Sequence, residues 1–170
     1  MKSANNIIIS LGKPVTAPVL VPVVHKSTPA CIDSPFMVNG ECYRVTAMAF
    51  DTPHSAVFVD DIESIDVPKL GKALGTHALF PKGASIVFIQ MMDKANLKAR
   101  VWQYGKGEAR FSYEAIGVAG TAAMMLQKTF EDKINVSMSG NIFTVHRNRN
   151  GGTINLSGPS ELIGFDKGSA

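Results

Sequence analysis

The stretch FSYEA, residues 111–115, holds the side chain of this chain best placed for chemistry, the hydroxyl of Ser112. It follows a glycine turn, YGKGE, and precedes the small-residue run AIGVAGTAAMM, a pattern that predicts a strand, a turn and then a helix. No His–Asp pair lies near Ser112 in the sequence to activate it. A hydroxyl is also far too weak an acid to replace a thiol in α-proton removal without unusual activation.

The predicted start of the helix, at Ser112, Tyr113 and Glu114, is a candidate anion site. The first backbone N–H groups of a helix have no partner within the helix, and the helix dipole places partial positive charge there. A ligand carboxylate could bind at this point. Glu114 could instead satisfy the dipole by itself, and the residues alone favour that alternative.

His54 follows Pro53 at the expected start of a strand. With an ordinary pKa of about 6.5 it could bind or orient a substrate, or it could hydrogen-bond to neighbouring backbone. The sequence leaves both roles open. No metal site is predicted, because Cys31 and Cys42 stand eleven residues apart without a local histidine.

The elements that must position these residues are mostly strands. Asn39-Gly40 between two apolar runs predicts a hairpin, and Asp66 predicts the N-cap of a short helix over 67–76. A longer helix is predicted over 113–128. Further strands are predicted in the segments NIIISLG, SAVFVDD, ASIVFIQMMD, NLKARVWQY, NVSMSG, IFTVHRN and TINLSGP.

The helix over 113–128 carries small residues on nearly every face, including Gly117 and Gly120. Each glycine costs about 1 kcal/mol relative to alanine inside a helix. A chain tolerates that cost where other elements must approach the helix closely. We therefore expect a central helix with strands wrapped around it, while Phe88 and Trp102 belong to the core.

Composition favours one folded domain of ordinary size: 170 residues, 45% hydrophobic, 18% charged and a net charge of +3. The basic cluster HRNRN (146–150) ends in two glycines and is typical of a solvated hairpin turn rather than a nucleic-acid site. No apolar run reaches transmembrane length, and the first residues do not form a signal-peptide core. These patterns and the two cysteines lead us to expect a cytoplasmic protein that binds neither membranes nor nucleic acid.

The order of the segments resembles the second half of diaminopimelate epimerase, of the pyridoxal-phosphate-independent racemases and epimerases. PHSAVFVDD, LFPKG, RVW and INLSGPSE follow that family's order and spacing, from about Asn6 to Phe165. The resemblance implies an α+β fold in which a curled mixed or antiparallel sheet, a β-roll or barrel, surrounds one central helix. It also implies two parts: residues 1–35, a strand and proline-rich extended connection left from a first half, and residues 36–170, the C-terminal domain.

The family uses no cofactor and places two cysteines, one from each half, on opposite faces of the substrate α-carbon. Gly105, Gly107 and Glu108 match the family's Gly-x-Gly-Glu turn, and Ser112 then falls on the position of the second cysteine. The resemblance implies that Ser112 and His54 are the candidate catalytic residues. It implies substrate-binding roles for the residues around them: Thr52, Ser85, Gln103, Tyr104, Tyr113 and Glu114.

Several of these residues depart from the family pattern. Thr52 and Ser85 replace asparagines, and Gln103-Tyr104 replaces a Glu-Arg pair that grips the substrate. The loss of a charged clamp should weaken the binding of a zwitterionic amino acid by several kcal/mol.

Two hypotheses follow. The chain could be one half of a split or heteromeric isomerase acting on an amino acid or related small acid, with a partner chain or a second copy completing the site. Alternatively, it is a catalytically degenerate half-domain that binds a small metabolite or serves as a structural partner subunit.

Overall fold

The computed structural model describes residues 6–16, 31–78 and 80–159 of the chain. Part of the predicted proline-rich connection, residues 17–30, lies outside the described residues. The helices are α1 (Val67–Gly75) and α2 (Tyr113–Met125), with a 3-10 turn η2 (Ile62–Ser64) before α1. The strands are β1 (Asn6–Gly12), β2 (Ser34–Val38), β3 (Glu41–Ala49), β4 (Pro53–Phe58), β5 (Ser85–Met91), β6 (Asn96–Gln103), β7 (Gly107–Ala109), β8 (Lys133–Met138), β9 (Asn141–Arg147) and β10 (Ile154–Pro159).

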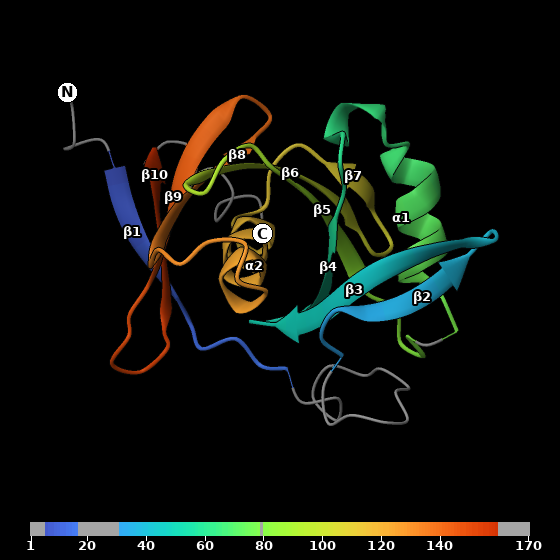
Figure 1. The fold of residues 1–170 in the computed structure, drawn as a ribbon, viewed down its shortest axis with the longest axis horizontal. Helices are drawn as coiled ribbons and strands as arrows, with labels where there is room; N and C mark the ends of the chain where they lie inside the picture. The colour runs from blue at the N-terminus through green and yellow to red at the C-terminus, as the bar shows by residue number, and fades with distance from the viewer. Residues whose placement is uncertain (1–5, 17–30, 79, 160–170) are drawn as a thin grey trace.

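All ten strands belong to one mixed sheet, in the order β1-β10-β9-β8-β6-β5-β4-β3-β2, with β7 paired to β6. The β4–β5 and β6–β8 pairs are parallel and the other pairs are antiparallel. Figure 1 shows the sheet curling around α2 without closing, while α1 lies on its outer side. This α+β architecture confirms the predicted fold.

The N-terminal strand β1 pairs antiparallel with β10, close to the other end of the described chain. Beyond β1, Val15 and Ala49 exchange two backbone hydrogen bonds of 2.8 Å, so the chain crosses from one side of the curled sheet to the other. Residues 6–12 therefore share a sheet with the C-terminal strands, and the division of the chain at residue 35 stays a prediction.

The central helix α2 is buried from Ala115 to Met124 and contacts strands on both sides of the curl. Gly117 and Gly120 show why its residues are small. A Cβ at Gly117 would collide with the side chain of Leu11, and one at Gly120 would collide with that of Val145. The small residues therefore allow the sheet to approach the helix from opposite sides.

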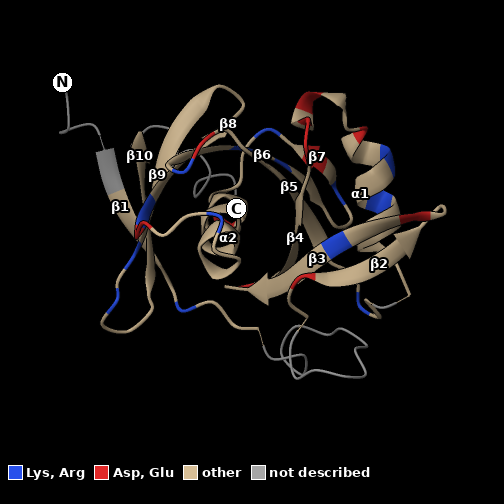
Figure 2. Ribbon diagram, in the orientation of Figure 1, with Lys and Arg blue, Asp and Glu red and all other residues tan. Residues whose placement is uncertain are grey.

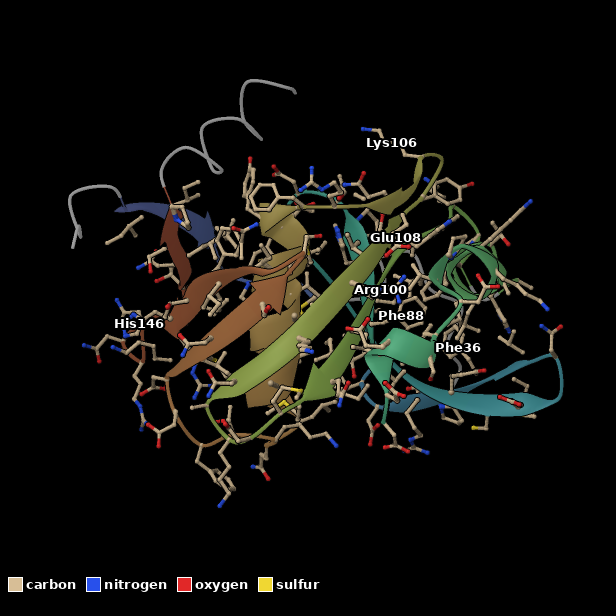
Figure 3. The ribbon with its side chains drawn as sticks, turned by 90° about the horizontal axis from the view of Figure 1, so that it is seen from above. Phe36, Phe88, Arg100, Lys106, Glu108 and His146 are labelled. Carbon is tan, nitrogen blue, oxygen red and sulfur yellow. The ribbon has the colours of Figure 1, made fainter. Side chains whose placement is uncertain are left out.

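A second layer of core lies between the outer face of the sheet and α1. Successive residues of β5 point to opposite faces, so Val87 packs toward α2 and Phe88 toward α1. Phe88 is joined there by Trp102 of β6 and Phe36 of β2. Phe88 and Trp102 thus lie in the core, as predicted from the sequence. Figure 3 shows Phe36 and Phe88 between the strands β5 and β6 and the helix α1. The middle of β5 is buried on both faces, which explains why residues 86–89 form a continuous apolar run.

The local signals in the sequence are largely confirmed. Asn39 and Gly40 form the β2–β3 turn with φ of 52° and 83°, and Asp66 caps α1 by accepting the Lys69 N–H at 3.2 Å. The prediction for α2 was wrong at its end, because the helix stops at Met125 rather than at residue 128. Gln127 adopts a left-handed φ of 59°, which turns the chain out of the helix.

The basic cluster forms the β9–β10 turn, as predicted. Arg147 pairs with Asp132 at 3.0 Å, and Arg149 pairs with the same carboxylate. Both arginines are thus engaged within the domain. Figure 2 shows the two signs of charge scattered among the elements, with no element coloured throughout in one sign.

Close packing around α2 gives a stability prediction. Gly120→Ala should gain about 1 kcal/mol of helix propensity, yet its methyl group must displace Val145, and such overpacking costs about 1–3 kcal/mol. We expect a lower free energy of unfolding in urea titrations. Gly151→Ala is the control, since its added methyl would meet no atom within 4 Å, and it should change stability by less than about 0.5 kcal/mol. A more stable Gly120→Ala protein would contradict this view of the helix.

Candidate functional site

A cleft of about 470 Å³ opens at the start of α2, and we call it the α2 cleft. Its walls come from the start of β4, the turn before β5, the β6–β7 turn and the first turn of α2. Seven of the eight site residues predicted from the sequence line it: Thr52, His54, Ser85, Gln103, Tyr104, Ser112 and Glu114.

Tyr113, the eighth, lines an adjacent groove of about 480 Å³ that we call the β1 groove, together with Ile9, Leu11, Phe50 and Asp51. The two hollows share Thr52, Gln103, Ser112 and Glu114. The fold therefore gathers all eight residues around one helix start. Parallel pairing of β4 and β5 contributes directly, because it sets His54 opposite Ser85.

Ser112 is the N-cap of α2. Its backbone is extended, and its Oγ accepts a hydrogen bond of 3.2 Å from the Ala115 N–H. The residue is buried, with 7% of its surface exposed. Among the described residues no acceptor takes the hydroxyl proton, so the oxygen serves the helix while the proton can still be donated.

Glu114 ties the helix start to the β3–β4 turn. Its carboxylate accepts hydrogen bonds from the Asp51 N–H at 2.7 Å, the Thr52 N–H at 3.2 Å and the Thr52 hydroxyl at 2.7 Å. The charge also lies in the first turn of α2, where the dipole favours it. Glu114 thus has a structural role: it connects the start of α2 to Asp51 and Thr52, which lie 63 and 62 residues earlier in the chain.

His54 is almost fully buried, with 3% exposure, and its Nδ1 lies 3.0 Å from the Thr52 carbonyl oxygen. A carbonyl oxygen can only accept, so Nδ1 carries the hydrogen and Nε2 of the neutral ring is an acceptor. Burial lowers the pKa of His54, although the Thr52 carbonyl and Glu114, 3.7 Å away, oppose the shift. The backbone contact anticipated for a structural histidine is present, and Nε2 keeps its capacity to accept.

The opposite wall joins two turns through Tyr104. The Tyr104 N–H donates to Ser85 Oγ at 3.0 Å, and the Tyr104 ring packs directly on Gly83. Gly83 has a φ of +77°, and any side chain there would collide with that ring. The wall that carries Gln103 and Tyr104 is therefore fixed to the turn before β5.

Sequence reasoning missed the two charged residues of the cleft other than Glu114, which are Lys82 and Lys106. Lys106 stands at the unspecified position of the Gly-x-Gly-Glu turn, and Lys82 lies in the segment LFPKG, to which no site role was given. Both are cations flanking a turn glycine, and that is the signal that could have identified them.

The described residues contain no group of three or more His, Cys, Asp or Glu side chains arranged to hold a metal ion. Over the same part of the chain, no helix combines the length and apolar character needed to cross a membrane. The hydrogen-bonding groups around the cleft are hydroxyl, imidazole, amide, carboxylate and ammonium groups, which suit a small polar ligand.

Comparison with known proteins agrees with this geometry. The sequence profile described as diaminopimelate epimerase matches residues 46–163, more than half of the chain. The chain belongs to the diaminopimelate epimerase family. The diaminopimelate epimerase of Desulforapulum autotrophicum is 29% identical over 157 residues, covering 92% of this chain and 55% of that protein. The Bacillus cereus enzyme is 29% identical over 156 residues, covering 91% and 54%. The chain thus spans about half the length of the curated relatives it matches.

Solved structures share the fold of this family member. A hydroxyproline epimerase of Agrobacterium vitis, crystallised with bound trans-4-hydroxy-L-proline, superposes with a TM-score of 0.62 at 12% identity over 91% of this chain and 50% of that one. A Bacillus anthracis phenazine biosynthesis protein of the PhzF family gives 0.54 at 15% identity, covering 90% and 57%. At such identities the likeness establishes the α+β fold alone.

The three hydrogen bonds of Glu114 predict a stability effect. Glu114→Ala leaves the Asp51 and Thr52 groups without their acceptor, so the free energy of unfolding should fall by about 2–3 kcal/mol. Glu63→Ala, at a side chain 72% exposed, should cost less than about 0.5 kcal/mol in the same urea titration. Equal effects of the two changes would mean that the carboxylate does not hold the turn.

The buried imidazole predicts a pH effect. The unfolded chain binds a proton at His54 near pH 6.5, while the folded chain binds it at lower pH because burial lowers the pKa. Between these values the unfolded state holds more protons, so stability falls as the pH drops through that window. His54→Gln should flatten this slope in melting temperatures measured from pH 7 to 5. His146→Gln, on the exposed face of β9, should leave it unchanged, and a slope retained without His54 would contradict the assignment.

Proposed function

We propose that this domain is one half of a cofactor-independent isomerase site that acts on an amino acid or a related small acid. The observation that carries the proposal is the convergence of Ser112, His54 and the start of α2 on one cleft, in a chain of the diaminopimelate epimerase family. A second half, on another chain, on a second copy or elsewhere in a longer protein, would supply the base for the opposite face.

In this proposal the residues of the cleft bind and orient the acid. The positive end of α2 stabilises the negative charge that develops on the carboxylate when the α-proton leaves. The Ser112 hydroxyl donates its unengaged proton toward the ligand, and the neutral His54 Nε2 accepts a hydrogen bond from it. Gln103 and Tyr104 contribute polar contacts without charge.

The second candidate is a degenerate half-domain that binds a small metabolite or supports a partner. It is favoured by the structural use of the site groups, since Ser112 Oγ caps α2 and Glu114 holds the β3–β4 turn. In this case capping α2 is the only role of Ser112, and the helix start is at most a binding site.

Deuterium exchange separates the two candidates. The protein is incubated in heavy water with a panel of amino acids and related acids, alone and with the separately produced first half of a diaminopimelate epimerase, and read by mass spectrometry. Alone it should not exchange an α-proton, because a serine hydroxyl cannot hold a thiolate's charge near pH 7. With the added half, whose cysteine supplies a base, exchange should appear, and Ser112→Ala should lower its rate because the hydroxyl no longer donates to the ligand.

Ser112→Cys should raise the exchange rate at least about tenfold, because a thiol with a pKa of about 8.5 restores an acid suited to this step. Ser64→Cys, which adds a thiol outside the cleft, is the matched control and should not change the rate. Exchange by the chain alone that Ser112→Ala abolishes would overturn the requirement for a second half. No exchange with any added half would leave the degenerate half-domain as the function.

A further inference from the structure

We propose that the α2 cleft is selective for a small acid with two anionic groups and no ammonium group, one of its anions being held by Lys82 and Lys106. This inference rests on the proposed function only in taking the cleft as the ligand site. It adds a ligand class, which follows from the charge of the two lysines and from the hydrogen bonds that Glu114 and His54 already form.

The two lysines stand on turns that are fixed to each other. Lys82 precedes Gly83, on which the Tyr104 ring packs, and Tyr104 also donates to Ser85. Lys106 follows in the same β6–β7 turn, which closes by a 3.0 Å hydrogen bond from the Lys106 N–H to the Gln103 carbonyl. Figure 3 shows Lys106 at the tip of this turn. Lys82 and Lys106 are therefore exposed residues on one wall of the cleft, which we call the lysine wall, and the two turns that carry them are fixed to each other.

Neither lysine forms an ion pair with a described residue. Glu114 is the one carboxylate among the described residues of the cleft, and its three hydrogen bonds commit it to the β3–β4 turn. Asp51, the other acidic residue near the helix start, lines the β1 groove instead. The lysine wall thus has positive charge that a ligand anion can balance, and it repels an ammonium group.

A second, independent feature of the cleft points to a ligand. His54 has only 3% of its surface exposed, and its Nε2 forms no hydrogen bond with a described residue. Since Nδ1 carries the ring hydrogen, Nε2 accepts, and a ligand hydroxyl can donate to it without carrying charge. A hydroxyl on a diacid therefore suits this cleft better than the ammonium group of an amino acid.

The test uses two probes that differ at one group. Racemic 2-hydroxyglutarate and racemic glutamate have the same carbon chain and two carboxylates, but the first carries a hydroxyl where the second carries an ammonium. Binding of each to the full chain is measured by amide NMR titration at low and high salt. We expect 2-hydroxyglutarate to bind about tenfold more tightly, with shifts centred on the α2 cleft, and high salt to weaken it.

Replacement of both lysines, Lys82→Gln with Lys106→Gln, should weaken 2-hydroxyglutarate binding about tenfold and remove the preference over glutamate. Lys94→Gln in the β5–β6 turn removes the same charge at the opposite end of these strands and should have no effect. Melting temperatures of the variants show that each remains folded.

Equal affinity for the two probes, a preference for glutamate, binding insensitive to the two lysines, or no binding of either probe would each overturn the inference. The proposed function is read separately, from α-proton exchange with the second half present. If the chain exchanges the α-proton of an amino acid in that assay but fails this titration, the proposed function stands and the inferred ligand class is wrong.

Discussion

The fold depends on one constraint, the burial of a helix inside a sheet that curls around it. Strands can approach α2 closely on opposite sides only where its side chains are small. Gly117 and Gly120 have no side chain, so Leu11 and Val145 can contact the helix backbone. The apolar runs of the strands supply the other half of that core. The buried middle of α2 cannot reach solvent, so a ligand can contact this helix only where it begins or ends.

At the start of α2 the same groups serve stability and recognition. His54 and Ser112 are buried and Glu114 is partly buried, which would be costly without partners. Each has at least one: the Thr52 carbonyl for His54, the Ala115 N–H for Ser112 and the β3–β4 turn for Glu114. The partners use up most of the hydrogen-bonding capacity of these side chains. What remains for a ligand is a hydroxyl proton, an imidazole nitrogen and the lysine wall, a small set that restricts which ligands fit.

The comparison with solved structures shows that the fold and the cleft depend on different residues. Solved structures at 12–15% identity share the fold of this chain, so the fold is compatible with very different sequences. The cleft follows different rules. Its charge depends on a few positions in turns, where Lys82 and Lys106 can appear without altering the core.

The sequence by itself determined the features that depend on neighbours along the chain: the Asn39-Gly40 turn, the Asp66 cap, the start of α2 and the order of strands that identifies the family. The end of α2 escaped it, because a left-handed residue at Gln127 follows no strong local preference. Only the tertiary structure decided that β1 pairs with β10, that Glu114 binds a turn 62 residues away and that two lysines share one wall. Such contacts join residues distant in sequence, and their energies depend on the packing of the whole sheet, which no short segment encodes.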